Sequence, residues 1–309
     1  MRLVTIDSLD DPRVADYRNL RDHELLQRED PFDPEGHRGL FIAEGELVVR
    51  RLLESTYRTR SLLIAPNRVD ALRDAIEPLP DDSPVFVADA KTLNDIVGFN
   101  IHRGILAAGI RPRPIPLDDL LGRDGPFVIL EDLFNHDNIG SIFRNAAALG
   151  GAGVTVLLSP RTADPLYRKC LRVSTGHALL IPWTRLEDWP GDLDRLRAAG
   201  VKLLAMTPGD DSRDIRDLAA ELSRSPSTCS SSEGGNTGAS PAQPKASAPQ
   251  RLAIMMGTEG PGLTEEAMAR SDARVHIDMP IGPGGARADS LNVAVAAAVA
   301  LFALASKPA

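Results

Sequence analysis

Residues 126–159, PFVILEDLFNHDNIGSIFRNAAALGGAGVTVLLS, are the main evidence in this sequence for its fold class. The stretch begins with an apolar run at residues 126–131 and ends with another at residues 153–159, and short apolar runs bounded by turn residues are typical of buried strands. The order strand, helix, strand predicts a βαβ unit. The helix is indicated by apolar side chains spaced three or four residues apart, as on one helical face: Ile139, Ile142, Phe143, Ala146 and Ala147.

Three further apolar runs, VKLLAM, RLAIMM and RVHIDM, occupy residues 201–206, 251–256 and 274–279. Helical patterns follow several of the apolar runs, so we expect an α/β fold with a mainly parallel sheet. In such a sheet, ligands bind in the loops at the carboxyl ends of the strands. We therefore expect the functional residues of this chain just after these runs.

The sequence also predicts two domains. Residues 111–116 read RPRPIP, and helix and central strand are both disfavoured there because proline lacks an amide donor and restricts the residue before it. We expect a small α/β domain over residues 1–110, a linker over residues 111–125 and a larger α/β domain over residues 126–309. Residues 223–250 have almost no apolar side chains to offset their ordering entropy, so we expect a disordered insertion there.

The cysteines and the apolar segments indicate a soluble, cytoplasmic protein. Cys170 and Cys229 have no neighbouring cysteine and no metal-ligand spacing, so we expect neither a disulfide nor a zinc site. The N-terminal segment lacks the apolar core of a signal peptide. The longest apolar run, residues 293–305, is too short to span a bilayer, so we expect no membrane partner.

The net charge of −8 argues against a partner coated in phosphates, because non-specific affinity for nucleic acids comes mainly from Lys and Arg. Two segments are locally basic. Residues 50–60 hold four Arg against one Glu, and residues 161–172 hold four basic side chains against one Asp. Such a segment alone is more often a solvated helix face than an RNA contact.

The segment NHDNIGSIFRNAAALGG, residues 135–151, holds the first candidate site residues. We expect Asn138 at the N-cap of the helix. Arg144 falls on a different face from Ile142 and Phe143, so it can project from the packed side. Taken alone, an asparagine cap and an exposed helical arginine are ordinary structural features.

Two glycine-rich segments supply the other candidates. Residues 257–263, GTEGPGL, follow a predicted strand and precede a helix that we expect Thr264 to cap. Their glycines allow the backbone to approach a ligand closely, and Glu259 places a carboxylate where a simple turn more often has Asn, Asp or Ser. Ser290 and Asn292 are the polar side chains at the start of an almost wholly apolar helix, which must be buried in the core or in a subunit interface.

The sequence lacks the characteristic motifs of several enzyme classes. No GxGxxG follows a strand, and GxxxxGK[ST], GxSxG and HExxH do not occur, which argues against dinucleotide-binding, nucleoside-triphosphate-binding, serine-hydrolase and zinc-hydrolase functions. His136 and His177 are candidate general bases, but an isolated histidine is more often a hydrogen-bonded structural residue.

The ordered set of motifs resembles the SpoU/TrmH family of RNA ribose 2'-O-methyltransferases. The first motif is Asn138-x-Gly140-xxx-Arg144-x-Ala146-xxx-Gly150, the second is Gly257-Thr258-Glu259-Gly260-x-Gly262-Leu263, and the third is Ser290-Leu291-Asn292-Val293-Ala294. In this sequence Asn135-His136 stands where the family commonly has Asp-Pro, and GPGGARAD, residues 282–289, lengthens the loop before the third motif. The N-terminal domain is similar to the L30e-like RNA-binding domain of many members.

The resemblance implies the SPOUT fold with a C-terminal trefoil knot, S-adenosylmethionine as cofactor, a homodimer and an RNA substrate, with ribosomal RNA favoured and transfer RNA as the alternative. It implies no metal. Arg144 would be the central catalytic residue, and Asn138, Glu259, Ser290 and Asn292 would organise the site. The implied cofactor-binding residues are Thr258, Glu259, Gly260, Gly262, Ile277, Met279, Ile281, Ser290, Leu291, Asn292 and Val293.

Two alternatives stay open at this point. One is a non-catalytic RNA-binding or ribosome-associated protein that retains the fold, which loss of Arg144, Glu259 or Asn292 would have favoured. The other is an unrelated α/β enzyme, such as a Rossmann oxidoreductase, that uses the glycine-rich loops for a different cofactor; the missing GxGxxG counts against it.

Overall fold

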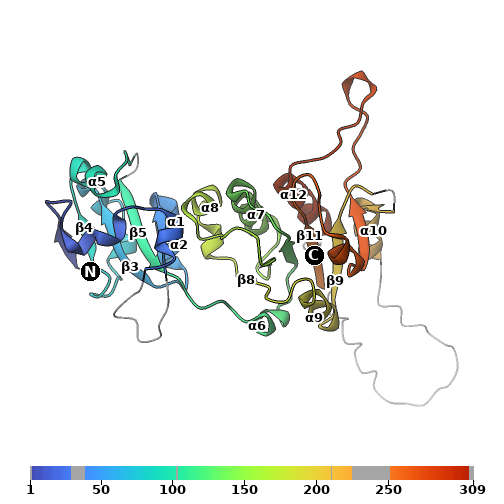
Figure 1. Ribbon diagram of the computed structural model, residues 1–309, viewed down its shortest axis with the longest axis horizontal. Helices are drawn as coiled ribbons and strands as arrows, with labels where there is room; N and C mark the ends of the chain where they lie inside the picture. The colour runs from blue at the N-terminus through green and yellow to red at the C-terminus, as the bar shows by residue number, and fades with distance from the viewer. Residues whose placement is uncertain (1, 29–38, 102–103, 210, 225–250, 306–309) are drawn as a thin grey trace, which may run out of the picture.

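The computed structural model of the protein describes residues 2–28, 39–101, 104–209, 211–224 and 251–305. Figure 1 shows two α/β units side by side along the long axis, the first built from N-terminal residues and the second from the rest of the chain. Each unit is built around one sheet.

The N-terminal sheet has the strand order β1-β4-β3-β5-β2, in which β5 is antiparallel to β2 and β3 and the other pairs are parallel. Side chains alternate between its two faces, so that Ile42 packs on one side and Phe41 on the other. The elements are β1 (Leu3–Thr5), the 3₁₀ helix η1 (Pro12–Tyr17), α1 (Asp22–Leu25), β2 (Leu40–Glu44), α2 (Glu46–Glu54), β3 (Thr59–Ile64), α3 (Pro66–Val69), α4 (Arg73–Ile76), β4 (Val85–Val87), α5 (Ala90–Val97) and β5 (Ile105–Ile110).

The second sheet has seven parallel strands in the order β10-β12-β9-β11-β6-β7-β8. Its elements are α6 (Leu117–Leu121), β6 (Phe127–Leu130), α7 (His136–Leu149), β7 (Thr155–Leu158), α8 (Arg168–Val173), η2 (His177–Leu179), β8 (Trp183–Arg185), α9 (Asp192–Ala198), β9 (Val201–Met206), β10 (Arg213–Asp214), α10 (Ile215–Arg224), β11 (Arg251–Met256), α11 (Glu265–Ala269), β12 (Ala273–His276), η3 (Pro283–Gly285) and α12 (Val293–Leu304).

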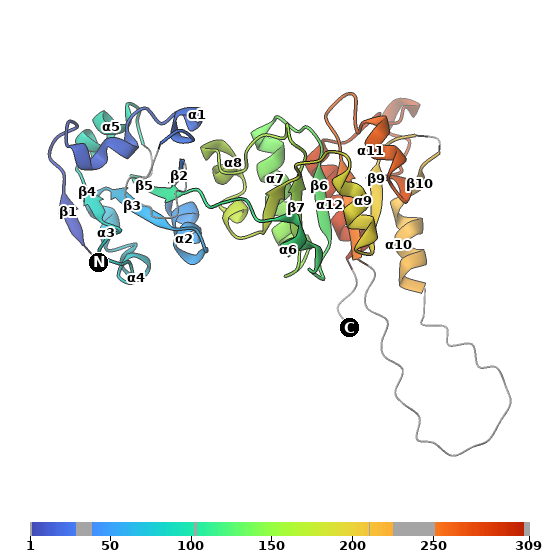
Figure 2. The same cartoon turned by 60° about the horizontal axis from the view of Figure 1, so that its bottom comes forward.

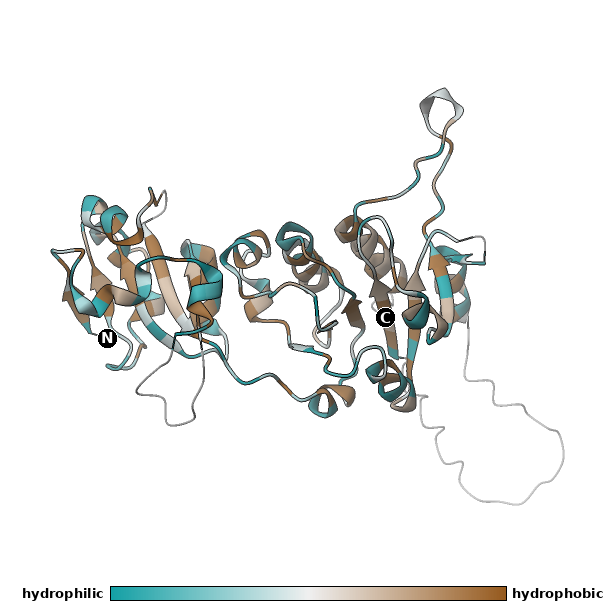
Figure 3. Ribbon diagram, viewed as in Figure 1, coloured by the Kyte–Doolittle hydropathy of each residue, from teal (hydrophilic) through white to brown (hydrophobic). Residues whose placement is uncertain are grey.

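Helices cover both faces of the second sheet. One face packs on α6, α9 and α11, and the opposite face packs on α7, α8 and α12. Figure 3 shows the strands and α12 coloured mainly as hydrophobic, as expected for a parallel sheet buried on both sides.

The two units share a continuous apolar core. The cluster that contains α7 and α12 also includes Val48 and Leu52 of α2 in the N-terminal unit. Figures 1 and 2 both place α8 between the N-terminal unit and α7. Polar contacts also cross this boundary, since Arg111 is paired with Asp164 at 2.8 Å and the Arg51 guanidinium donates to the Thr175 carbonyl.

The predicted α/β class and the mainly parallel second sheet are confirmed. Residues 126–159 form β6, α7 and β7, and the runs at 201–206 and 251–256 are the strands β9 and β11. The run at 274–279 is only partly a strand, because β12 ends at His276 and the next three residues lie in a loop.

The proline-rich residues 111–116 form neither helix nor strand, but the short helix α6 lies within the predicted linker and packs on the second sheet through Leu117 and Leu120. The division into domains remains a prediction. Residues 223 and 224 end α10, whereas residues 225–250 of the predicted disordered insertion lie outside the described residues. Among the residues that the structure describes, no helix has the length and apolarity needed to cross a membrane.

Candidate active site

The start of α7 places Asn138 inside the helix rather than at its cap. Asn135 is the N-cap, and its side chain accepts a hydrogen bond from the Asp137 amide at 2.9 Å. The prediction that Asn138 caps this helix is therefore wrong. Both asparagines precede the apolar face, and sequence spacing alone did not show which one takes the extended backbone conformation of a cap.

The amide of Asn138 is instead free to join two distant segments. Its Nδ2 donates to Glu259 Oε1 at 2.8 Å. Asn292 Nδ2 donates to Asn138 Oδ1 at 2.9 Å and to Glu259 Oε1 at 3.1 Å. The three sequence clusters thus meet in one hydrogen-bonded group, which we call the Asn–Glu–Asn cluster and define as Asn138, Glu259 and Asn292.

Asn292 also caps α12. Its Oδ1 accepts from the amides of Ala294 at 3.0 Å and Val295 at 3.4 Å. One asparagine side chain therefore holds the first turn of α12 and, through its nitrogen, the other two members of the cluster. Asn292 therefore caps α12 with its side-chain oxygen and binds the cluster with its side-chain nitrogen, so capping is only one of its two roles.

The loop 257–263 is closed on itself. The amides of Thr258 and Gly262 each donate to the other residue's carbonyl at 3.1 Å. Gly260 and Gly262 have φ values of +100° and +75°, a region that residues with a side chain rarely adopt. As predicted, Thr264 caps the following helix, with its side chain accepting from the Ala267 amide at 3.3 Å.

A pocket of about 750 Å³ opens beside this loop, at the carboxyl ends of β9, β11 and β12. Nearly all of the predicted cofactor-binding residues line it: Thr258, Glu259, Gly260, Gly262, Ile277, Met279, Ser290, Leu291, Asn292 and Val293. Ile281 does not line it and is 65% exposed on the projecting loop before α12. Arg287, from the lengthened part of that loop, does line the pocket.

One wall of the pocket was not predicted from the sequence. Met206 is the last residue of β9, and Thr207 and Pro208 follow it. Ser212 and His276 line the same wall, with 2.8 Å between Ser212 Oγ and His276 Nδ1. This wall lies where ligands of parallel sheets generally bind, after the apolar run at 201–206, although none of its residues was named from the sequence.

Arg144 lies outside the pocket wall on an exposed position of α7. Burial lowers the pKa of His177, and the positive charges of Arg51 and Arg144 lower that pKa further. Arg144 and Arg51 of α2 thus both act electrostatically on η2, which contacts α7 and α2. The other candidate base, His136, is stacked on Tyr167 with ring centroids 5.0 Å apart, and burial lowers its pKa.

The two basic segments are largely neutralised by acidic side chains. In residues 50–60, Arg50 pairs with Glu46 and Asp74, Arg58 with Asp82 and Arg60 with Asp16. In residues 161–172, Arg161 pairs with Asp132, Arg168 with Glu44 and Lys169 with Asp137. Sequence charge counts overstated the free positive charge of these segments, because their partners come from elsewhere in the chain.

The model of the SpoU rRNA Methylase family matches residues 125–302, which include all three motifs and the Asn–Glu–Asn cluster. The chain belongs to the SpoU rRNA methylase family. Over 293 residues this SpoU member is 37% identical to an uncharacterized tRNA/rRNA methyltransferase of Mycobacterium tuberculosis strain H37Rv, covering 95% of the present chain and 88% of the relative. It is 28% identical to the 23S rRNA (adenosine(1067)-2'-O)-methyltransferase of Streptomyces azureus, covering 71% and 68% of the two chains.

Solved structures share the fold of this SpoU member. An AdoMet-bound rRNA methyltransferase from Sinorhizobium meliloti aligns with a TM-score of 0.68 and 23% identity over 98% of this chain and 97% of the other. The SpoU methyltransferase AviRb from Streptomyces viridochromogenes, in complex with AdoMet, aligns with a TM-score of 0.67 and 22% identity over 96% and 98%. The trefoil knot and the L30e-like character of the N-terminal unit remain predictions.

Proposed function

We propose that this protein transfers a methyl group from S-adenosylmethionine to a ribose 2'-hydroxyl of RNA, with ribosomal RNA favoured and transfer RNA as the alternative. The observation that carries the proposal is the Asn–Glu–Asn cluster at the edge of the 750 Å³ pocket, in a chain of the SpoU rRNA methylase family. The similarity to a 23S rRNA (adenosine(1067)-2'-O)-methyltransferase supports the ribose as the methylated group.

The pocket fits S-adenosylmethionine in size and chemistry. Ligand pockets of about 300–1,000 Å³ lined by apolar groups with a few polar ones are typical for molecules of this class, and this pocket combines Met256, Ile277 and Leu291 with Thr258 and Ser290. The open sides of Gly260 and Gly262, where an added Cβ would meet nothing within 4 Å, leave the loop backbone accessible. When bound, the cofactor supplies a methyl group that its sulfonium already activates.

The protein's own side chains would position the RNA. A guanidinium holds its proton too tightly to act as a base, so we assign Arg144 to holding the phosphate and the 2'-hydroxyl of the target nucleotide for in-line attack. Asn138, Glu259, Ser290 and Asn292 would organise the pocket edge at which that hydroxyl arrives. The exposure of Arg144 leaves it accessible to a large substrate.

The proposal includes a homodimer and a cytoplasmic location. Val295 and Phe302 of α12 are 48% and 71% exposed, and a separation of seven residues puts them on the same helix face. Exposed apolar side chains gathered on one face are typical of protein interfaces. A second copy of the chain that packs on α12 would cover them.

Labelled methyl transfer tests the proposal. The full chain is incubated with S-adenosylmethionine labelled in its methyl group and with ribosomal or transfer RNA, and alkali-stable label in nucleotides is measured. We expect the wild type to label ribose and Arg144→Ala to lose about 100-fold or more of the rate. Arg197→Ala, which removes an exposed arginine of α9 on the sheet face opposite to α7, is the matched control and should remain within about twofold of wild type.

Two outcomes would contradict the proposal. If the wild type binds S-adenosylmethionine but labels neither RNA, a non-catalytic RNA-binding role replaces it. If calorimetry detects no binding of S-adenosylmethionine, the cofactor assignment fails as well.

A further inference from the structure

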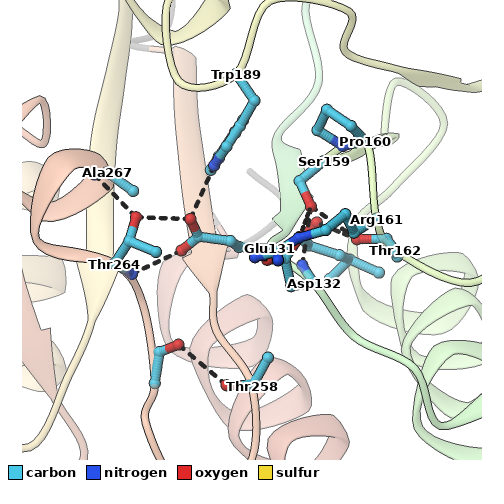
Figure 4. A network of polar contacts seen from close by, with 12 residues as sticks. Glu131, Asp132, Ser159, Pro160, Arg161, Thr162, Trp189, Thr258, Thr264 and Ala267 are labelled. Carbon is cyan, nitrogen blue, oxygen red and sulfur yellow. Dashed lines mark hydrogen bonds and ion pairs between the residues drawn. The ribbon is translucent and has the colours of Figure 1, made fainter.

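A buried carboxylate outside the three motifs lies behind loop 257–263, which borders the proposed cofactor pocket. Glu131 follows β6 and is 1% exposed. Its Oε1 accepts from Trp189 Nε1 at 2.8 Å and from Thr264 Oγ1 at 2.7 Å, and its Oε2 accepts from the Thr264 amide at 2.9 Å. Figure 4 shows the Glu131 side chain between Trp189 and Thr264.

Glu131 contacts both ends of loop 257–263. Thr264, the partner of its carboxylate, is the residue directly after the loop. Met256, directly before the loop, accepts from the Glu131 amide at 2.9 Å. One residue therefore holds the two points at which the loop leaves and re-enters the body of the fold.

We propose that Glu131 is a positioning residue that sets the conformation of loop 257–263, and with it the cofactor pocket and the place of Glu259. The inference rests on the function proposed above. The loop makes its own internal hydrogen bonds between Thr258 and Gly262, so it behaves as one unit whose placement depends on its two ends. Because Trp189 shares Oε1 with Thr264, its indole reports on the same contact.

The chemistry of the contact requires a carboxylate. All the groups that face its two oxygens are donors, and glutamine would replace one oxygen with an amide nitrogen that also donates. In one orientation this nitrogen faces the Thr264 amide, and in the other it faces the Trp189 indole. Glu131→Gln therefore leaves one buried donor unsatisfied in either orientation, and the loop end must move to relieve it.

The neighbouring residue offers a matched control. Asp132 is also a buried carboxylate, and its Oδ1 accepts from Ser159 Oγ at 2.7 Å. Figure 4 shows that its contacts lie on the opposite side from Thr264, toward Ser159 and Arg161. Asp132→Asn, like Glu131→Gln, replaces a buried carboxylate with an amide, but its side chain does not contact loop 257–263.

Calorimetry with S-adenosylhomocysteine on the full chain tests the proposal. We expect Glu131→Gln to raise the Kd about tenfold and Asp132→Asn to change it less than about twofold, although both lower the melting temperature. Trp189→Phe removes one of the three donors and should raise the Kd by a smaller factor, which provides a second variant if Glu131→Gln does not fold. A merely structural role would make Kd follow the melting temperature in all variants.

Fluorescence supplies a second readout. The chain has two tryptophans, so Trp183→Phe leaves Trp189 as the single emitter. We expect S-adenosylhomocysteine to change its emission, and we expect Glu131→Gln in the same background to abolish that change. Wild-type affinity in Glu131→Gln, or equal weakening in Asp132→Asn, overturns the role of Glu131 alone. Absence of binding in the wild type overturns both this inference and the proposed function.

Discussion

At the scale of the residue, the amide of Asn138 does what few other side chains could. It donates to the Glu259 carboxylate and accepts from the Asn292 amide at the same time. An asparagine has both a donor and an acceptor at its tip, whereas a carboxylate at neutral pH has only acceptors. The identity of this residue therefore follows from its two partners and not from the helix in which it lies.

Asn138→Asp tests this reading. The new carboxylate would face Glu259 at hydrogen-bond distance, and two such groups cannot both ionise at low cost. We expect methyl transfer at pH 8 to fall about 100-fold. The ratio of mutant to wild-type rate should rise as the pH is lowered toward 6, because protonation of one carboxyl restores a donor.

Asn135→Asp controls for the change of charge in the same turn. Aspartate caps a helix as well as asparagine does, so this variant should retain near wild-type activity. A mutant-to-wild-type ratio for Asn138→Asp that is independent of pH would contradict the proposed cluster.

At the scale of the element, loop 257–263 depends on the absence of a side chain at Gly257. A Cβ there would lie 2.2 Å from the backbone carbon of Gly262 and 2.2 Å from the nitrogen of Leu263. Backbone atoms cannot rotate away as the end of a flexible side chain can. The closed loop and a side chain at position 257 are therefore incompatible.

Gly257→Ala should open the loop and raise the Kd for S-adenosylmethionine at least tenfold, as measured by calorimetry. This expectation follows from the cost of about 1–3 kcal/mol for strain or lost contacts at such a site. Gly122→Ala is the control, since a Cβ there meets nothing within 4 Å and φ is −83°. Its stability should be unchanged or raised by up to about 1 kcal/mol. Unaltered cofactor affinity in Gly257→Ala would show that the loop conformation is not required for binding.

At the scale of the whole molecule, one side of α12 packs in the core and the other side is exposed to solvent. Ala297 and Leu301 are buried against the rest of the fold, while Val295 and Phe302 point outward. A helix that is apolar all round is expected to be buried on all sides, but a single copy of this chain buries only part of α12. This difference is the physical basis of the proposed homodimer.

Phe302→Asp should convert the proposed dimer to a monomer, as measured by light scattering after size-exclusion chromatography. A charge at the centre of an apolar interface would be desolvated without a partner. Leu47→Asp is the control because Leu47 is a similarly exposed apolar residue, at 54%, on α2 of the N-terminal unit. A wild-type chain that is already monomeric at micromolar concentration would refute the dimer.

Local sequence patterns were sufficient to predict the α/β class, the strands β6, β7, β9 and β11, the packed face of α7 and the family motifs. These features depend on hydrophobic periods and on the order of residues over short distances, which the chain carries locally. The cap of α7, the partners of the basic segments and the role of Glu131 depended on tertiary structure. The members of the Asn–Glu–Asn cluster are separated by 121 and 154 residues along the chain. Only the order of the strands in the folded sheet brings them into contact, because no short-range pattern encodes which strand ends become neighbours.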